Sequence, residues 1–500
     1  MPRGSRSRRS AVVAALAGAA ALVSTTAAQA STPPAVGTGP STSTAPYVLP
    51  AAPGVGIASL LTVGDAVGGY RMVGIPDGIG VRSLGRGGVE VLLNHELRDT
   101  QGTVRAHGQP GAFVSRWEID PATGAVTAGS DLVRTVAYWS YAAGDHSGAA
   151  AAFSRFCSAS LTAPGQLFDQ RTRTGYPGQV YFANEEGGEG RTFGVTLDGA
   201  AWQLPRLGLF GKENTIAAPT TSRTTLVLGN EDTSEGQIWA YWGTKRSTGT
   251  PMDRAGLTNG INHVLAVPGV TSDAGFRAAY GTGSPARVGF AEVDWNAGNA
   301  EQNAAAAAVG VAFNRVEDGS FDPRHPDDYY FLTTEGGDTT PAEPGVTRDG
   351  GGLWRLRFDD VDHPERGGTL TLLLDGSEAP YLSKPDNMTI DERGNLLIQE
   401  DPGANDHLAR ILAYRIADGA LGVLAQFDPA QFTPGSAGYL TNDEESSGIV
   451  DVSRLIGRPS TFLFDAQVHA PLPDPELVER GQLLVMTVRS WGRVYATDHS

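Results

Sequence analysis

The sequence predicts an all-β protein, a β-propeller of about six blades with insertions between them. The chain of 500 residues contains 65 Gly and 31 Pro, a composition that disfavours coiled coils and helical bundles. Short alternating runs of β-branched and aromatic residues are separated by Gly, Asn and Asp turns, which is the pattern of antiparallel hairpins. These hairpins recur at irregular intervals, as expected for blades that bury their faces only against neighbouring blades. A two-sheet sandwich is the alternative, but it would not explain the repeated acids described below.

The N-terminus has the features of an export signal. Residues 1–30 contain four arginines, an apolar stretch over residues 11–23 and a small-residue cleavage site at residues 28–30. The pair Arg8-Arg9 resembles a twin-arginine motif, although Ser10 and the residues after it depart from the usual pattern, so both export routes stay open. No later segment reaches about 18 apolar residues, and we therefore expect no stable membrane anchor. We expect a flexible leader rich in Ser, Thr, Pro and Ala over residues 31–53 and one propeller domain over residues 54–500.

Six stretches fit a hairpin in which the first run ends near an acid and the second contains an aromatic residue. They are residues 91–96 with 113–120, 180–186 with 191–198, 226–232 with 237–242, 329–335 with 353–359, 395–401 with 410–416, and 483–488 with 493–498. Only the Ala-rich run at residues 304–313 is typical of a helix.

A second repeat lies upstream of three of these hairpins. A base, an acid and a short side chain recur in Lys212-Glu213-Asn214, Arg315-Val316-Glu317-Asp318 and Lys384-Pro385-Asp386-Asn387. The spacing from Glu213 to Glu231 equals the spacing from Glu317 to Glu335, which is 18 residues. We interpret residues 443–448 as a degenerate copy of the same repeat.

The repeated acids indicate where chemistry could occur. Inner strands of a propeller and the loops that leave them face the central channel, so acids at one register would converge on one mouth of that channel. The acids at such strand ends are Glu96, Glu185, Glu186, Glu231, Asp232, Glu335, Glu400 and Asp401. Crowded carboxylates need cations to neutralise them, and many oxygen ligands suit Ca²⁺ or another hard cation. The alternative is that these acids are solvated turn residues.

The net charge and the absence of common catalytic motifs exclude several classes of function. The formal net charge of −17 disfavours binding to polyanions, so we expect no nucleic-acid partner. The sequence lacks a G-x-S-x-G elbow, an H-E-x-x-H motif and a P-loop, which removes the common serine hydrolase, zincin and nucleotide-binding hypotheses. The single cysteine, Cys157, cannot form an internal disulfide, and is either buried and inert or bound to a ligand. Nearby, Arg155 could pair with an anion or form a salt bridge at a sheet edge.

Several segments in order resemble one known family. They are Leu92-Leu93-Asn94-His95-Glu96, Arg155-Phe156-Cys157-Ser158, residues 313–318, and Lys384-Pro385-Asp386-Asn387 with Gly394-Asn395-Leu396. From Leu60 to the C-terminus the chain resembles the PhoX family of secreted alkaline phosphatases. The resemblance implies a β-propeller, twin-arginine export to the extracellular or cell-wall space, and a cluster of Fe³⁺ and Ca²⁺ at the channel mouth. It also implies hydrolysis of small phosphomonoesters, and we expect a monomer.

The resemblance also implies roles for individual residues. Cys157 would be the thiolate on iron, and Glu96, Glu231, Glu317 and Glu335 would be carboxylate ligands of iron or Ca²⁺. Further contacts to the cluster would come from Asp386, Asn387, Glu213 and Glu400. We expect catalytic roles for Arg155 and Glu317. Lys384 departs from the family pattern, which bears on substrate preference. Two other functions remain open, a Ca²⁺-dependent phytase-like propeller and a non-catalytic binding module stabilised by Ca²⁺.

Overall fold

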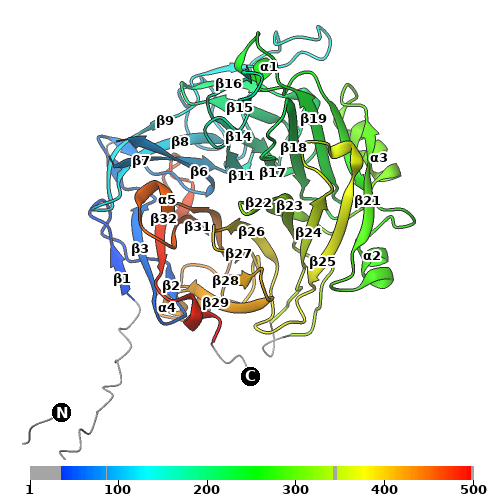
Figure 1. The fold of residues 1–500 in the computed structure, drawn as a ribbon. Helices are drawn as coiled ribbons and strands as arrows, with labels where there is room; N and C mark the ends of the chain where they lie inside the picture. The colour runs from blue at the N-terminus through cyan, green and yellow to red at the C-terminus, as the bar shows by residue number, and fades with distance from the viewer. Residues whose placement is uncertain (1–34, 86, 342–345, 497–500) are drawn as a thin grey trace, which may run out of the picture.

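The structure, a computed structural model, describes residues 35–85, 87–341 and 346–496. In these residues the chain forms six blades around a central axis (Figure 1), which confirms the predicted β-propeller. Each blade contributes one strand to the channel, and each of these inner strands contacts the next until β30 contacts β6 and closes the ring. The inner strands are β6 (Pro76–Gly85), β11 (Phe156–Leu161), β17 (Lys212–Ala217), β22 (Val316–Asp322), β26 (Pro385–Ile390) and β30 (Glu444–Asp451).

The first two blades are separate antiparallel sheets. The first blade continues outward from β6 through β7 (Gly88–His95), β8 (Phe113–Asp120) and β9 (Ala125–Asp131). The second continues from β11 through β14 (Val180–Glu185), β15 (Thr192–Thr196) and β16 (Ala200–Gln203), with β10 (Thr135–Ala137) parallel at its edge. Two short hairpins, β4 (Ala66–Val67) with β5 (Tyr70–Arg71) and β12 (Phe168–Asp169) with β13 (Thr174–Gly175), lie outside the blades.

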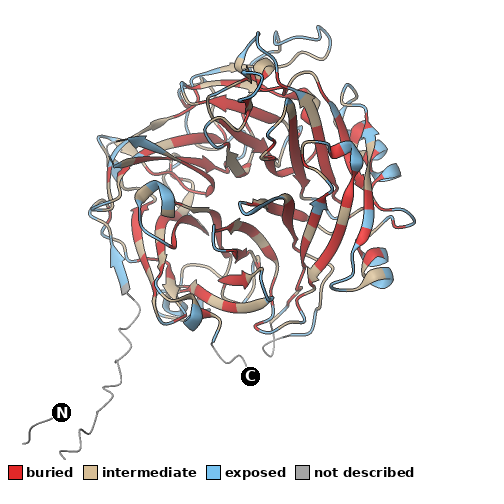
Figure 2. Cartoon of the chain, viewed as in Figure 1, coloured by how far each residue is buried: buried red, intermediate tan, exposed pale blue. Residues whose placement is uncertain are grey.

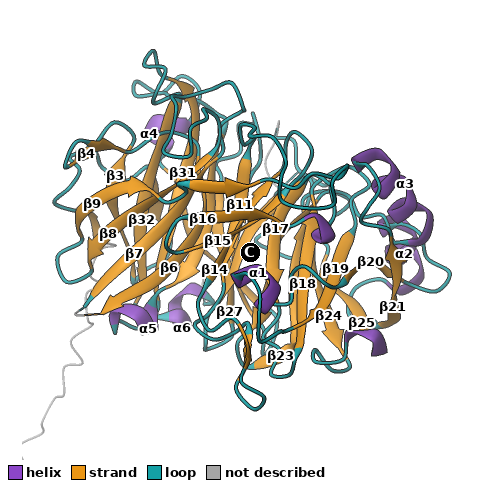
Figure 3. Cartoon of the chain, turned by 90° about the horizontal axis from the view of Figure 1, so that it is seen from above, coloured by secondary structure: helices purple, strands orange, loops and turns teal. Residues whose placement is uncertain are grey.

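The third and fourth blades share one nine-stranded sheet. The third contains β18 (Thr224–Glu231), β19 (Ile238–Thr244) and β20 (Ile261–Ala266), and the fourth contains β23 (His325–Thr333), β24 (Gly352–Phe358) and β25 (Gly368–Leu374). The strand β21 (Ala286–Val293) pairs with both β20 and β25 and so joins the two blades at the rim. Helices α2 (Asp273–Tyr280) and α3 (Asn299–Val309) lie outside this rim (Figure 3).

The N-terminal strands complete the last two blades. The fifth blade contains β27 (Asn395–Glu400), β28 (Arg410–Arg415) and β29 (Ala420–Phe427), with β2 (Val48–Pro50) at its edge. The sixth contains β31 (Thr461–Pro471), β32 (Glu479–Val488) and β3 (Val55–Thr62), with β1 (Ala35–Thr38) at its edge. Because β3 pairs antiparallel with β32, strands from the two ends of the chain close the ring. Short helices complete the structure: α1 (Pro251–Arg254), α4 (Pro429–Phe432), α5 (Ser453–Ile456), α6 (Trp491–Val494), η1 (Pro205–Leu207) and η2 (Pro364–Arg366).

Buried residues follow the strands of the blades (Figure 2), and clusters of buried apolar residues join neighbouring blades. In β8, Trp117 and Ile119 are buried and Glu118 between them is exposed, the alternation expected of a strand with one face in the core. Trp117, Trp239 and Trp354 are fully buried, and Trp239 stacks on Phe210 with ring centroids 4.5 Å apart. Within the described residues, no helix has the length and apolar character needed to cross a bilayer.

The structure differs from the sequence predictions in three places. The last expected hairpin was wrong, because β32 pairs with β31 and the chain after it forms α6. Residues 35–38 and 48–50 are edge strands of the blades, and Tyr47 and Val48 are buried. The flexible leader expected over residues 31–53 therefore includes residues that belong to the propeller. The Ala-rich helix, α3, begins at Asn299 and ends before Gly310. The predicted export signal lies outside the described residues.

Candidate active site

Six residues at one register form a ring at one mouth of the channel. Each is the second residue of its inner strand, and in five of the six strands the pairing register shifts directly after the first residue. Such bulges turn a side chain away from its regular direction. We call this set the inner ring: Asp77, Cys157, Glu213, Glu317, Asp386 and Glu445. The three acids of the upstream sequence repeat therefore occupy equivalent positions, and the degenerate copy supplies a fourth.

A second set of residues lies near the ends of the strands paired with the inner strands: five come directly after their strand, and His469 lies within β31. In all six blades the backbone N–H of this residue donates to the carbonyl oxygen two residues before the inner-ring residue, over 2.9 to 3.1 Å. We call this set the mouth ring: Glu96, Glu186, Asp232, Thr334, Asp401 and His469. The shared hydrogen bond places the same two side chains of every blade at the mouth.

The residue that accepts this hydrogen bond has an unusual backbone in four blades. Ile75, Arg155, Arg315 and Lys384 have φ angles of 52°, 50°, 58° and 46°. Non-glycine residues in this left-handed region cost about 1–3 kcal/mol each and cluster at functional sites. Three of the four are cationic, so the strained turns bring positive charge to an acidic mouth.

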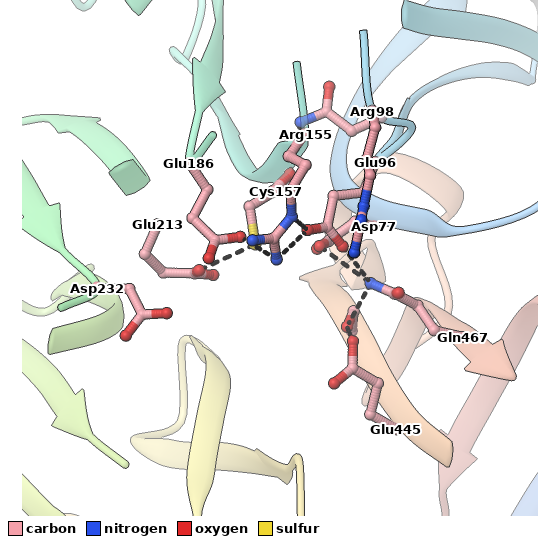
Figure 4. Close-up of polar contacts among 12 residues, drawn as sticks. Asp77, Glu96, Arg98, Arg155, Cys157, Glu186, Glu213, Asp232, Glu445 and Gln467 are labelled. Carbon is pink, nitrogen blue, oxygen red and sulfur yellow. Dashed lines mark hydrogen bonds and ion pairs between the residues drawn. The ribbon is translucent and has the colours of Figure 1, made fainter. Parts of the chain in front are cut away.

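Two arginines pair with carboxylates across blade boundaries. Arg155 Nη2 lies 2.7 Å from Glu96 Oε1 and 2.5 Å from Glu186 Oε2 (Figure 4). Arg315 donates from Nε and Nη2 to both Asp232 oxygens at 2.8 and 2.9 Å. These contacts fix both guanidinium groups at the mouth, and for Arg155 they are the salt bridge that the sequence left open beside an anion-pairing role.

The ring residues form three groups, and within each group the ligand atoms lie within 4.8 Å of one another. The first is Asp77, Glu96 and Cys157, the second is Glu213, Glu317 and Asp386, and the third is Asp386, Asp401 and Glu445. They line or underlie a cavity of about 560 Å³. Each group offers the number and type of donors that a cation needs from a protein, and Asp386 connects two of them.

Burial makes these acids difficult to ionise without a cation. It raises the pKa of Glu213 well above its usual value, and the charges of Asp386 and Glu317 raise it further. Burial followed by the charge of Asp77 likewise raises the pKa of the Cys157 thiol. The pKa values of Asp77, Glu317, Asp386 and Glu445 are also raised, mainly by burial. Bound cations would reverse these shifts because they favour the charged forms.

Unsatisfied oxygens support the same conclusion. Among the described residues, Asp77 Oδ1 and Asp386 Oδ1 are buried and have no hydrogen-bond partner. A buried polar atom without a partner costs about 1–3 kcal/mol, so such atoms need an explanation. Both belong to candidate metal groups, and a cation would satisfy them. The donor set therefore fits a metal cluster.

The structure brings several predicted site residues into these groups. Glu96, Cys157, Glu213, Glu317 and Asp386 each belong to one of the three groups. The predicted contact Asn387 acts indirectly, because its Nδ2 donates to Glu213 Oε1 over 3.2 Å and orients that carboxylate.

Three other predicted ligands lie outside the groups. Glu231 accepts hydrogen bonds from Gln237 N and Trp239 Nε1, and Glu400 is held by Arg410 and His407. The Glu335 side chain is 42% exposed and lies 3.8 Å from Lys384. Each is one residue away from the mouth ring, and successive side chains of a strand point in opposite directions.

Sequence reasoning did not single out Asp77, His469 or Glu479 at the cavity. Asp77 follows a proline, as Asp386 does in Lys384-Pro385-Asp386, and this shared Pro-Asp pair could have revealed it. His469 occupies the mouth-ring position of the sixth blade, and its Nδ1 lies 2.8 Å from Glu479 Oε2. No repeated motif marks this pair.

The fold and the site define a six-bladed propeller with, at one channel mouth, an acidic centre whose side chains are of the types that hold metal ions. A family model described as alkaline phosphatase PhoX matches residues 165–445. The chain belongs to the PhoX family, which confirms the resemblance seen in the sequence, and it is a phosphatase of that family.

Three solved structures are similar to this chain, and the first of them supports the fold. Pseudomonas fluorescens PhoX in complex with vanadate, a transition state analogue, has 13% identity and a TM-score of 0.63, over 88% of this chain and 97% of that chain. A luciferin-regenerating enzyme has 11% identity and a TM-score of 0.34, over 86% and 95% of the two chains. A putative 6-phosphogluconolactonase from Bacteroides uniformis has 12% identity and a TM-score of 0.31, over 78% and 95%. The chain matches no curated protein.

Proposed function

We propose that this phosphatase hydrolyses phosphomonoesters at a cluster of ferric iron and Ca²⁺ held by the inner and mouth rings. The observation that carries the proposal is the meeting of six inner-ring side chains, five acids and one thiol, in three groups of potential metal ligands, two of which share Asp386. Carboxylates alone would repel a phosphate dianion, so cations must lie between them and the substrate.

The donor chemistry divides the metals between the groups. The group of Asp77, Glu96 and Cys157 contains the only thiol of the chain and suits iron, because thiolates favour transition metals over Ca²⁺. The two all-carboxylate groups suit Ca²⁺. When bound, such cations supply Lewis-acid activation of the phosphate and of the attacking nucleophile.

The two arginines bind and orient the phosphate. The contacts of Arg155 to Glu96 and Glu186 use Nε and Nη2, and those of Arg315 to Asp232 and Glu317 use the same two atoms. In each arginine, Nη1 is therefore the donor offered to a phosphate oxygen. Arg155 remains 41% exposed, so an incoming substrate can reach it.

Glu317 positions one of these arginines in addition to its place in a metal group. Its Oε1 lies 3.2 Å from Arg315 Nη2 and accepts a hydrogen bond from Thr334 Oγ1 at 2.5 Å. Because two neighbours fix the carboxylate, the guanidinium is held in one orientation before substrate arrives. Preorganised charge of this kind stabilises the transition state of phosphoryl transfer.

The proposal is tested by phosphate release from 4-nitrophenyl phosphate at alkaline pH, with metal analysis of the same sample. We expect turnover that chelation of Ca²⁺ abolishes and that added Ca²⁺ restores, together with bound iron in the active protein. A folded, metal-replete protein that releases no phosphate would contradict the proposal. Hydrolysis of inositol hexakisphosphate in preference to simple monoesters, without iron, would instead support a phytase-like enzyme.

We also propose that residues 1–30 direct export of the protein through the twin-arginine route. The four arginines and the apolar stretch support export, and a metal cluster assembled before transport would require a route that carries folded proteins. Replacing Arg8 and Arg9 with Lys should retain the precursor inside the cell, as seen by fractionation. Unchanged export of this variant would favour the general secretory route.

A further inference from the structure

A second cavity lies beside the candidate active site. It has a volume of about 370 Å³ and is lined by aromatic side chains of the segment that follows β10, including Tyr138, Trp139 and Tyr141. Three parts of the chain contribute neighbouring residues to both cavities: Arg98 and Asp99, Arg155 and Ser154, and Glu186 and Gly188. The two cavities are therefore adjacent, and we call the second one the aromatic cleft.

The aromatic wall of the cleft is held firmly by its neighbours. The Trp139 ring packs edge-on against His146 and Trp295, with centroids 5.1 and 6.2 Å apart. Tyr138 donates from its hydroxyl to Ala151 O over 2.6 Å and packs edge-on against Phe193. A preformed aromatic wall loses little conformational entropy when it binds a flat ligand.

Two hydrogen-bond donors in this wall have no acceptor among the described residues. Among the residues that the structure describes, Trp139 Nε1 and the Tyr141 hydroxyl are buried and have no hydrogen-bond partner. Buried tryptophan and tyrosine polar atoms are normally paired, so these two are available to acceptor atoms of a ligand. The ligand should therefore carry both a flat ring and hydrogen-bond acceptors.

The charges in the cleft exclude a second phosphate. Asp99 and Glu189 line it with carboxylates, and its one lining arginine, Arg191, is held by both oxygens of Glu185 at 2.6 Å. Of the described lining residues, none offers a cation that is not already paired. A neutral or cationic group is compatible with these charges, whereas a further phosphate would be repelled.

We propose that the aromatic cleft binds the leaving group of the substrate when that group is a flat ring with hydrogen-bond acceptors, as in a nucleoside monophosphate. This inference rests on the proposed function, because it assumes that the phosphate of the same molecule lies at Arg155. Binding of the leaving group in the aromatic cleft makes the enzyme selective among phosphomonoesters. Aromatic esters are preferred to small aliphatic ones, and monophosphates are preferred to polyphosphates.

The test compares adenosine 5′-monophosphate with glycerol 1-phosphate in the metal-loaded enzyme. In Trp139→Ala, the ratio of kcat/KM for the adenosine ester to that for the glycerol ester should fall about tenfold, the loss expected for one stacking contact. Ala149→Trp, which fills the cleft from its exposed edge without removing any packing, should lower the same ratio. Leu455→Ala in α5, at the opposite end of the channel, is the control and should leave the ratio unchanged.

Binding of adenosine, which carries no phosphate, tests this inference independently of the proposed function. Adenosine should bind the wild-type enzyme and compete with the adenosine ester, and Ala149→Trp should weaken its binding. Equal losses on both esters in Trp139→Ala, together with adenosine binding unaffected by Ala149→Trp, would overturn the inference. If the wild-type protein hydrolyses neither ester, the proposed function fails, and adenosine binding to wild type and to Ala149→Trp still decides whether the cleft holds an aromatic ring.

Discussion

The Sγ atom of Cys157 lies 3.0 Å from Oε2 of Glu213, so the second residues of two neighbouring inner strands meet at the channel mouth. Asn387 from the fifth blade donates to the other oxygen of the same carboxylate. Three blades thus converge on one acid. Because each side chain is fixed by a strand of a different blade, ring closure is needed to assemble the site.

We predict that Cys157→Ser loses iron and phosphatase activity while it stays folded. A serine hydroxyl fits the same space, but it is a poor ligand for iron compared with a thiolate. Iron content per protein and initial rates on 4-nitrophenyl phosphate check the prediction, with circular dichroism as the test of folding. A Ser variant that binds iron normally and keeps full activity would remove Cys157 from the site.

A pair of glutamates on one hairpin tests the register of the site. Glu317→Gln should lower kcat/KM by more than about 100-fold, because it removes a charge from a metal group and releases Arg315. Glu335→Gln, on the same hairpin but outside the three metal groups, should change kcat/KM by less than about twofold. Comparable losses in both variants, measured on metal-loaded protein, would contradict the assignment.

Glu400 is expected to contribute to stability rather than to catalysis. Although burial raises its pKa, the charges of Arg410 and His407 lower it to about 2. Glu400→Gln leaves Arg410 without its carboxylate in a buried position, which should cost about 3–5 kcal/mol of the free energy of unfolding. Chemical denaturation measures this loss, and the specific activity of the folded fraction should stay close to that of wild type. An inactive variant of normal stability would instead support the expectation that Glu400 contacts the metal cluster.

The pair of His469 and Glu479 should make the free energy of unfolding decrease as the pH rises into the alkaline range. Burial lowers the pKa of His469, but the hydrogen bond and charge of Glu479 outweigh it and raise this pKa from 6.5 to about 9. The folded state therefore holds a proton that the unfolded state releases. This contribution to stability is fully present below about pH 6.5 and is lost as pH rises through about 9.

Thermal unfolding between pH 6 and pH 10 measures this effect. The Tm of wild type should fall over this range by more than the Tm of His469→Gln, in which no imidazole titrates. Parallel Tm profiles for the two proteins would show that the pair does not stabilise the fold through this proton.

The sequence alone determined the fold class, because alternation, turn residues and repeated hairpins are local features. It also pointed to Glu213, Glu317 and Asp386, since their shared motif places each at the start of an inner strand. Glu96 was among the acids expected at the strand ends, and the role of Cys157 as an iron ligand came from the family resemblance. Asp77 was not found, because its strand lacks the base and acid motif of the other copies.

Only the tertiary structure decided which acids at the strand ends face the channel. Glu231 and Asp232 are neighbours in the sequence, yet Glu231 bonds to Trp239 of its own blade and Asp232 pairs with Arg315 of the next. One residue of register turns a strand side chain to the opposite face, and hydrophobic pattern does not fix register at a polar strand end. In each blade a hydrogen bond between the paired strands fixes this register, whereas contacts between blades, such as that of Asp232 with Arg315, exist only once the blades have assembled.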